Sequence, residues 1–392
     1  MLSFIDPDEA LRLVLQHTPD ARYEQVPLAE AMLRVLVRRV VADRGYPPFD
    51  RAMMDGFAVR VADAGRVVPV AGEVAAGVAP QVEVAPGSAV AIMTGAVCPR
   101  GTEAVVPVEQ VDRTDEGVGL PRPIVAGQHI VPAGSERGAG EVVVPAGTLI
   151  KAMELAVLAA VGCETVVVTA RPTMAVISTG DEVVAAGTDP ERHQIRNSNG
   201  PMLGAAARGL GLPRVTLLHA DDTEDALHRA LKLAEADIVL LSGGVSAGRY
   251  DLVPQVLQQA GASIVFHRVT QKPGKPLLLA RRGDRLFFGL PGNPISSHFC
   301  FQRYVAAAVR RLTGRPEPAV DRGVLATDLS VRGERTLFLP ARVVWSGDAW
   351  QVAPVVVGSG NIFACVDTVA YARLAPGEHR LKAGAAISFE WM

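Results

Sequence analysis

The segment at residues 237–294 constrains this chain most, because three polar turns follow three apolar, strand-like runs within it. The first run, residues 237–241, leads into the glycine-rich sequence SGGVSAG at residues 242–248. Glycine lets backbone N–H groups approach an anion closely, and the start of a helix adds partial positive charge. The sequences KPGKP (272–276) and LPGNP (290–294) supply the other two turns. In an open α/β sheet such turns meet at the carboxyl edge of the strands, so the segment predicts a ligand site for an anion there.

From residue 173 to a long predicted helix at residues 295–312, predicted strands and helices alternate. This alternation predicts a mostly parallel sheet with helices on both faces. Residues 45–132 instead contain short β-runs, including residues 83–84, that are separated by glycine and proline, which predicts a β-rich domain of barrel or sandwich type. The tail also reads as β, because the hairpin signal SGD at residues 346–348 joins two β-runs.

Helical patterns flank the β-rich insert. Asp6 and Pro7 predict a helix start with Glu9 placed for a capping box, a second helix is expected from Pro27, and a third within residues 145–162. We therefore predict a multidomain α/β plus β protein. Its domains are a discontinuous extended helical/β domain (1–44 plus 133–170), a β-rich inserted domain (45–132), a central mostly parallel α/β domain (171–316) and a small C-terminal β-barrel-like domain (317–392).

Composition excludes several classes of protein. A formal net charge of −2 and a pI near 6.5 give no global attraction to nucleic acid or anionic membranes, so we expect neither as a partner. The four cysteines are far apart and form no CxxC pair, which argues against a disulfide framework or a zinc site. We find no signal peptide and no apolar run of transmembrane length, so a cytoplasmic location is expected. P-loop, Rossmann, zinc-protease and nucleophile-elbow motifs are absent.

Carboxylates recur where the predicted α/β strands end. Asp181 and Glu182 follow the first strand, Asp221 and Asp222 the second, and Asp251 lies just beyond the glycine-rich turn. Clustered carboxylates beside an anion site are what Mg²⁺ needs to bridge protein and phosphate oxygens. Asp222 and Asp251 also stand where a helix N-cap belongs, and each alone is better explained as a cap. No cap explains Glu182, so the group together favours a metal or polar-ligand site.

Other polar residues are less informative by themselves. Lys272 and Lys275 are compact cations that suit a phosphate or another tetrahedral oxyanion. Turn chemistry alone accounts for Asp55 in MMDGF, Thr94 in IMTGA and Ser359 in GSG, so their function stays open. The residue pattern predicts a Mg²⁺-assisted site for a phosphorylated or oxyanionic ligand and does not identify that ligand.

Eight short motifs occur in order along the chain: MDGFA (54–58), MTGA (93–96), PAGT (145–148), STGDE (178–182), QIRNSN (194–199), SGGVS (242–246), KPGKP (272–276) and GLPGNP (289–294). Each motif is weak alone, but the ordered set resembles the molybdopterin molybdenumtransferase family, the molybdenum insertases related to the E domain of gephyrin. The resemblance extends over essentially the whole chain, because the family's four-domain layout is similar to the one predicted above.

The resemblance implies molybdenum cofactor biosynthesis: Mg²⁺-dependent insertion of molybdate into adenylylated molybdopterin, with release of AMP. It implies catalytic roles for Asp55, Glu182, Asp221 and Asp251, the last three also as metal ligands. The substrate-binding residues that it implies are Thr94, Ser242, Gly243, Gly244, Ser246, Arg268, Lys272, Lys275, Pro291, Pro294 and Ser359. Family members act as homodimers that share the active site, so Asp55 and Thr94 would serve the neighbouring subunit. A molybdopterin-adenylylating enzyme is the candidate substrate donor.

Some positions depart from the family pattern. Glu136 stands where many members have Asp, and Arg268 where Lys is also found. Asn197 replaces an acidic residue, and Arg249 stands where an acid is frequent, so both changes make the site more basic. The segment at residues 335–342 aligns poorly, which leaves the role of the tail arginines open.

Two further functions remain in competition. The α/β domain is shared with molybdopterin-adenylylating enzymes, although the β-rich insert and the tail argue against that activity. A non-enzymatic role as a pterin-holding scaffold is the other alternative. No residue separates molybdate from tungstate as the preferred oxyanion.

Overall fold

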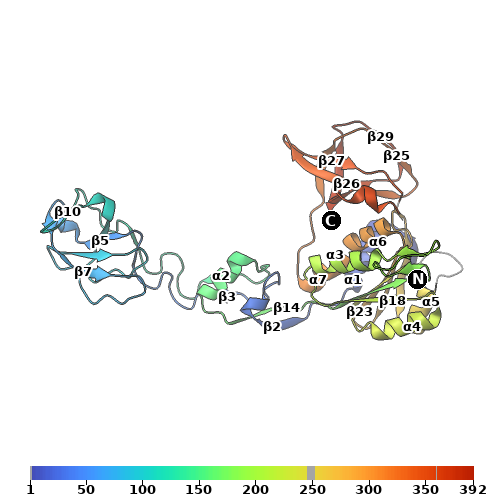
Figure 1. The fold of residues 1–392 in the computed structure, drawn as a ribbon, viewed down its shortest axis with the longest axis horizontal. Coiled ribbons are helices and arrows are strands. Elements are labelled where there is room, and N and C mark those ends of the chain that lie inside the picture. The colour runs from blue at the N-terminus through green and yellow to red at the C-terminus, as the bar shows by residue number, and fades with distance from the viewer. Residues whose placement is uncertain (1, 245–251, 359) are drawn as a thin grey trace. The chain divides into compact units, whose positions relative to one another are not determined.

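The computed structural model describes residues 2–244, 252–358 and 360–392 (Figure 1). Contacts divide the chain into two compact units. The first unit spans residues 1–24, 33–35 and 168–392, and the second spans residues 25–32 and 36–167. Each unit has a hydrophobic core of its own.

The first unit is built on a seven-stranded sheet with the order β1-β20-β22-β23-β19-β15-β18. The bounds of these strands are Leu2–Ile5 (β1), Met174–Thr179 (β15), Val215–Ala220 (β18), Ile238–Ser242 (β19), Ser263–Val269 (β20), Leu278–Arg282 (β22) and Arg285–Leu290 (β23). Only β22 runs antiparallel to its neighbours. The sheet is mostly parallel, as predicted, and its parallel strands all end at one edge.

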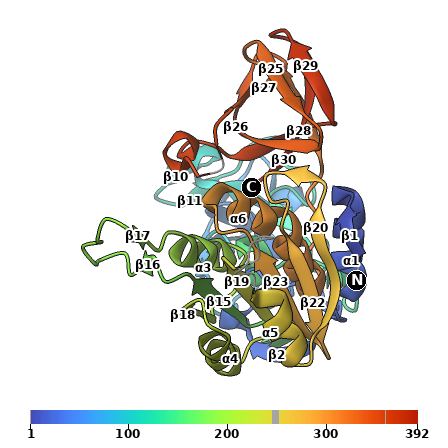
Figure 2. The same cartoon turned by 90° about the vertical axis from the view of Figure 1, so that its right-hand side faces the viewer.

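Helices cover both faces of this sheet (Figures 1 and 2). Their bounds are Pro7–His17 (α1), Asn199–Gly209 (α3), Glu224–Leu233 (α4), Val253–Gln259 (α5), Pro294–Cys300 (α6) and Ala306–Thr313 (α7), and a π-helical turn, Phe301–Val305, joins α6 to α7. Side chains alternate along β15, so Met174 and Val176 enter the core under α1, α3, α6 and α7, whereas Ala175 and Ile177 enter the core under α4 and α5. Every helix of the described residues is too short or too polar to cross a bilayer.

A small closed barrel ends the first unit. Strand β26 pairs with both β27 and β28, which closes the ring β26-β27-β24-β30-β28. The bounds are Asp321–Leu325 (β24), Thr336–Ser346 (β26), Ala349–Pro354 (β27), Ala370–Leu374 (β28) and Ala386–Trp391 (β30), with Leu329–Gly333 (β25) and Gly377–Leu381 (β29) as a separate pair. The predicted hairpin is β26–β27. Phe338 and Tyr371 of the barrel pack on Phe299 of α6, with ring centroids 4.5 and 5.0 Å from that of Phe299. Figure 2 shows the barrel above this helix.

The second unit consists mainly of short strands. Its sheets have the orders β7-β8-β5-β9, β10-β11-β6, β12-β4 and β13-β3. The bounds are Val40–Val41 (β3), Arg51–Ala52 (β4), Gly56–Val59 (β5), Val67–Val68 (β6), Val70–Val74 (β7), Ala89–Ile92 (β8), Ala104–Pro107 (β9), Asp112–Thr114 (β10), Gly117–Gly119 (β11), Ile130–Val131 (β12) and Val142–Val144 (β13), and one helix is Ala152–Ala160 (α2). Strand β5 is central, because Phe57 and Val59 enter one core and Ala58 the other.

Two predicted elements are wrong. The helix expected from Pro27 is only a 3₁₀ turn, Leu28–Glu30, because the preceding residues pair as strand β2 (Tyr23–Pro27) with β14 (Thr165–Thr169) and Leu33 has a φ of 61°, which no helix tolerates. The run at residues 83–84 forms no strand. Val84 is instead fully buried as a single core side chain, and its N–H donates to the carbonyl of Arg100 at 2.9 Å.

The N-terminal segment also differs from the predicted domain grouping. Asp6 caps α1 as expected, accepting from Asp8 N at 2.8 Å, but Glu9 pairs with Arg12 instead of completing a capping box. Strand β1 joins the seven-stranded sheet and α1 packs into its core, so residues 1–24 group with the α/β sheet. Burial of Ala10, Leu13 and Val14 of α1 in the core of the sheet explains this grouping, whereas β1 itself is mostly exposed and joins through backbone pairing. The other domain boundaries stay predictions.

The carboxylate of Asp8 ties α1 to the rest of the first unit and generates a stability prediction. It accepts from Arg373 of the barrel at 2.6 and 3.0 Å and from buried Arg303 of the π turn at 2.6 Å. The Arg373 hydrogen bond lowers the pKa of Asp8 below its ordinary value of 3.8. Asp8→Asn should lose about 1 kcal/mol of unfolding free energy at pH 7, a modest value because the carboxylate is half-exposed and Arg303 keeps Glu390 as a partner.

Because the folded-state pKa is depressed, this contribution is present above pH 3.8 and is lost as the pH falls through the folded-state value. Urea unfolding across that range should show the two proteins converging in acid. Glu9→Gln on the same helical turn is the control and should change stability much less. A difference between Asp8→Asn and wild type that does not change with pH would contradict the assignment.

Candidate active site

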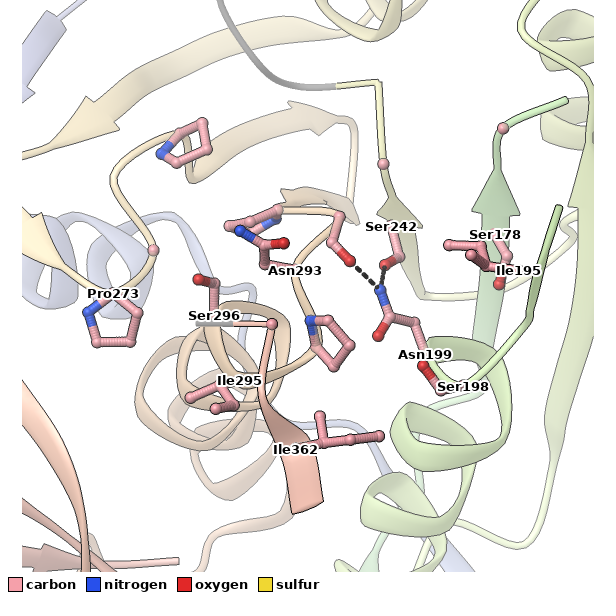
Figure 3. Close-up of a pocket in the computed structure, with 18 of the residues that line it drawn as sticks. Ser178, Ile195, Ser198, Asn199, Ser242, Pro273, Asn293, Ile295, Ser296 and Ile362 are labelled. Atoms are coloured by element: carbon pink, nitrogen blue, oxygen red, sulfur yellow. Dashed lines mark hydrogen bonds between the residues drawn. The ribbon is translucent and has the colours of Figure 1, made fainter. Parts of the chain in front are cut away.

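A cavity of about 1140 Å³ opens at the carboxyl edge of the sheet, within the first unit. The turns after β15, β19 and β23 line it, together with residues 272–276, which follow β20. Figure 3 shows side chains from these turns facing one space, with Asn199 and Ser242 opposite Pro273 and with Ile362 from the C-terminal region below. The three turns predicted to meet at this edge therefore do so.

The glycine turn after β19 is fixed by its neighbours. Gly243 has a φ of 107°, and a Cβ there would lie 2.5 Å from Thr179 Oγ1 and 2.8 Å from the Thr179 carbonyl oxygen, so only glycine fits. Asn199 Nδ2 donates to Ser242 Oγ at 2.8 Å and to the carbonyl of Gly292 at 2.7 Å (Figure 3). Within the described residues, Thr179 Oγ1 and Asn199 Oδ1 are buried and make no hydrogen bond. Buried polar atoms of this kind are typical of functional sites.

Carboxylates line the cavity after β15 and near β18. Glu182 and Asp222 both lie in its wall, and Asp181 Oδ1 accepts from Asp222 N at 3.0 Å. Burial, followed by the charges of Asp181 and Glu182, raises the pKa of Asp222. Asp222 is not the cap of α4, because Thr223 Oγ1 accepts from Ala226 N at 3.2 Å. The cap interpretation of Asp222 is therefore wrong.

Asp221 lies elsewhere among the described residues. It lines a separate hollow of about 300 Å³ beside α4, and its carboxylate is 3.8 Å from His219 Nε2. The sequence placed both acids in one carboxylate group and the resemblance gave the metal role to Asp221, whereas the structure puts Asp222 in the wall of the main cavity. Strand β18 ends at Ala220, so the alternation of side chains along the strand cannot be extended to the two acids that follow it. The predicted catalytic and metal role of Asp221 stays a prediction.

Three cations line another part of the cavity. Lys272 and Lys275 come from the turn after β20, and Arg335 comes from the residues just before β26 of the barrel. Arg335 Nη1 donates to the carbonyl of Gln271 at 3.0 Å. The poor alignment of residues 335–342 with the family had left the role of the tail arginines undetermined. The only sequence signal was the position of Arg335 immediately before a strand.

The order of the strands separates Glu182 and Asp222 from the two lysines, whereas Arg196 is a cation that lines the cavity from β17 (Ile195–Arg196). Strand β15 lies four strand spacings from β20, roughly 19 Å at about 4.8 Å each, with β22, β23 and β19 between them. The glycine turn and residues 290–294, which contain Pro291 and Pro294, therefore occupy the middle of the edge. This arrangement suits an elongated anionic ligand with a cation bound toward one end.

Asp55 and Thr94 belong to the second unit and contact each other. Asp55 Oδ1 accepts from the backbone N and from Oγ1 of Thr94, both at 2.7 Å. The backbone hydrogen bond is the main cause of the lowered pKa of Asp55. Asp55, just before β5, and Thr94, shortly after β8, are distant in sequence but thus form one polar pair.

Arg268 lies on β20 with a φ of 75°, and its guanidinium lies over the ring of Phe4 at 5.4 Å from the centroid. It is not among the residues that line the cavity. The predicted residues Ser246, Asp251 and Ser359, and the departure at Arg249, lie outside the described residues.

Two departures from the family pattern have clear structural roles. Asn197 Oδ1 accepts from Gly200 N at 2.9 Å and from Ser178 Oγ at 3.2 Å, so the amide supplies the acceptor that a carboxylate would supply at the start of α3. Glu136 accepts from Arg51 at 2.7 Å in the second unit, so its longer side chain forms an ion pair there.

The described residues form no group of three or more His, Cys, Asp and Glu side chains arranged around a metal. Mg²⁺ in proteins is often held by one or two carboxylates together with water and substrate phosphates. Glu182 and Asp222 fit that mode, since burial and then the charges of Asp181 and Glu182 raise the pKa of Asp222, and a cation would stabilise its charged form.

These features define a multidomain α/β protein whose main cavity lies at the carboxyl edge of a mostly parallel sheet and is lined by both acidic and basic groups. Residues 5–162 match the family described as the MoeA N-terminal region (domain I and II), and residues 175–311 match the probable molybdopterin binding domain. The chain is 31% identical over 391 residues to a molybdopterin molybdenumtransferase of Synechocystis sp., covering 97% of this chain and 98% of the relative.

A molybdopterin molybdenumtransferase of Bacillus subtilis is 32% identical over 396 residues, covering 97% and 92% of the two chains. The crystal structure of the molybdopterin biosynthesis moeA protein from Pyrococcus horikoshii is similar, with a TM-score of 0.81, 27% identity and 100% coverage of both chains. This chain belongs to the molybdopterin molybdenumtransferase family. It is a transferase of molybdenum cofactor biosynthesis.

The crowded carboxylates predict that Asp222→Asn stabilises the protein at neutral pH. The raised pKa means that the folded state holds the Asp222 proton more tightly than the unfolded state, whose value is near 3.8. Wild type therefore loses stability relative to the amide as the pH rises through that interval, and the difference, which solvent screening of this partly exposed group keeps small, is complete above it. Thermal unfolding between pH 3 and 8 measures this difference.

Added Mg²⁺ should stabilise wild type more than Asp222→Asn. Asp225→Asn is the matched control: this acid in the first turn of the same helix complements the helix dipole, so its loss should destabilise slightly. A destabilised Asp222→Asn protein at pH 7 would refute the repulsion argument.

Proposed function

We propose that this transferase inserts molybdate into adenylylated molybdopterin and releases AMP in a Mg²⁺-dependent step. The observation that carries the proposal is the order of groups along the sheet edge: carboxylates by β15 and β18, the glycine turn after β19 and lysines after β20. Adenylylated molybdopterin is long and contains a pyrophosphate, and molybdate is a compact tetrahedral oxyanion. A cavity of about 1140 Å³ with this distribution suits both together.

The middle of the edge binds the pyrophosphate. Gly243 and Gly244 present backbone close to the ligand because neither carries a side chain. Pro291 and Pro294 keep the adjacent turn rigid, so less entropy is lost when the ligand binds. Lys272, Lys275 and Arg335 hold molybdate, because three cations offset its two negative charges and donate to its oxygens.

Glu182 and Asp222 would hold Mg²⁺ together with phosphate oxygens of the substrate, and the predicted ligands Asp221 and Asp251 are further candidates. When bound, the cation would supply positive charge to offset that of the phosphates. The protein residues position the phosphates and exclude bulk water. Cleavage of the P–O–P bond by water needs this positioning and charge compensation more than a side-chain nucleophile.

A second copy of the chain completes the site in this proposal. Asp55 and Thr94, already paired by two hydrogen bonds, serve the cavity of the neighbouring subunit in a homodimer. A molybdopterin-adenylylating enzyme supplies the substrate, because the adenylyl group must be added before it can leave.

The proposal predicts that Glu182→Gln lowers AMP release from adenylylated molybdopterin by about 100-fold, because one charged ligand for the cation is lost. Lys272→Gln should instead raise the molybdate concentration needed for turnover. AMP release by the purified protein, with Mg²⁺ and with or without molybdate, measures both effects. Lys232→Gln, an exposed lysine on α4, is the control and should behave as wild type.

The same assay separates the alternatives. AMP release that depends on molybdate and yields active cofactor supports the transferase. Adenylylation of molybdopterin from ATP would instead support the adenylylating activity. Tight binding of the adenylylated pterin without turnover, with either molybdate or tungstate, would show a holding role and refute the proposal.

A further inference from the structure

Gln271 is a fully buried polar side chain directly beneath the cationic turn. Its exposed fraction is 0%, although it immediately precedes Lys272, which is exposed. The pattern continues along the turn, since Gly274 is buried and Lys275 is exposed. A buried amide is unfavourable unless hydrogen bonds replace those it makes with water, so the partners of Gln271 reveal what it does.

The side chain of Gln271 uses both ends of its amide. Nε2 donates to the carbonyl of Gly274 at 3.2 Å and to Cys300 Sγ at 3.7 Å. Oε1 accepts from the hydroxyl of Tyr304, which lies in the π turn between α6 and α7. Tyr304 and Cys300 are also fully buried. The amide therefore connects the lysine turn to the helix that supports the cavity floor.

The backbone of Gln271 makes a third connection. Its carbonyl accepts from Arg335 Nη1 at 3.0 Å, and β21 (Gln271–Lys272) pairs in parallel with the first residues of β26. On the opposite side, Thr270 N and Oγ1 donate to the carbonyl of Ile5 at 2.8 and 3.0 Å. Thr270 and Gln271 together thus connect the lysine turn to the N-terminal strand and to the arginine of the barrel.

The turn has no space for a side chain at position 274. The φ of Gly274 is 88°, and a Cβ there would lie 2.5 Å from Cys300 Sγ and 2.8 Å from Gln271 Nε2. The glycine lets the backbone carbonyl approach the amide closely enough to be bound. Buried contacts beneath the turn therefore help to set the positions of Lys272 and Lys275. Lys275 is held in addition by its own contacts, since its carbonyl accepts from Val269 N at 2.8 Å and its ammonium lies 5.3 Å from the centroid of the Phe4 ring.

We propose that Gln271 is a positioning residue for oxyanion binding: its amide and carbonyl hold Lys272, Lys275 and Arg335 in one arrangement that fits a tetrahedral oxyanion. The inference rests on the proposed function, because it assigns these cations to molybdate. Gln271 does not line the cavity, so it acts through its neighbours. Three cations repel one another, and without a fixed scaffold they would separate when no anion is bound.

Gln271→Met tests the inference, since methionine has a similar length but makes neither amide hydrogen bond. We expect molybdate to bind between about 10-fold and 100-fold more weakly by calorimetry, because cations displaced by a fraction of an ångström fit the oxyanion poorly. The KM for molybdate should rise in parallel, whereas kcat at saturating molybdate and the affinity for adenylylated pterin should stay within about twofold.

Two further variants separate positioning from a general loss of stability. Tyr304→Phe removes only the hydroxyl that donates to Gln271 Oε1, so it should also weaken molybdate binding. The variant that carries both substitutions should bind molybdate about as tightly as Gln271→Met alone, because both remove the same contact. Thr313→Val is the matched control: it deletes a buried hydroxyl of α7 that donates to Val309 O at 2.8 Å, far along the helix from the turn. This control should lower thermal stability and leave molybdate affinity unchanged.

The outcomes distinguish the inference from the proposed function. Wild type that binds molybdate but releases no AMP refutes the function, while weaker binding by both Gln271→Met and Tyr304→Phe still supports the positioning role. If Gln271→Met folds and binds molybdate as tightly as wild type, the inference is overturned. If Gln271→Met does not fold, an unchanged molybdate affinity of Tyr304→Phe overturns it instead. Equal losses of affinity in the variants and in Thr313→Val would also overturn it.

Discussion

The parallel alignment of the strands is the constraint on which the rest of the first unit depends. Because β15, β18, β19, β20 and β23 run in one direction, the turns that follow them all reach the same edge of the sheet. Side chains more than a hundred residues apart in sequence, such as Glu182 and Arg335, then line one cavity. The fit of Gly243 against Thr179 shows how tightly neighbouring turns pack, since no side chain is tolerated there.

Strand order also places the carboxylates and the lysines of this edge apart. Glu182 and Asp222 lie at the β15 and β18 end and the lysines follow β20, so these groups do not form ion pairs with each other across the glycine turn, and Arg196 of β17 is a further cation of the cavity wall. Burial, followed by the charges of Asp181 and Glu182, raises the pKa of Asp222, so the charged form of this carboxyl is disfavoured at that end. Groups that destabilise a fold but face a cavity are typical of ligand-binding sites, where the ligand supplies the missing charge.

Segments that are distant from one another in sequence form the support beneath the cavity. Asp8 of α1 bridges Arg303 of the π turn and Arg373 of the barrel, and Tyr304 of the same turn binds Gln271. The π turn widens the helix at that point, so its side chains reach both the N-terminal segment and the lysine turn. The barrel is therefore part of the site as well as a separate fold, since it contributes Arg335 and packs Phe338 on α6.

The sequence by itself determined the alternating α/β elements, the C-terminal hairpin, the turns after β19, β20 and β23 and the family, because local patterns of apolar residues, glycine and proline specify these features. Only the tertiary structure decided that residues 23–27 pair as a strand, that β1 and α1 join the sheet, that Asp222 rather than Asp221 lines the cavity and that Arg335 reaches it. Each of these depends on contacts between segments far apart in the chain. Such contacts override local propensity, because burial and hydrogen bonding across the fold contribute more free energy than the preference of any single residue.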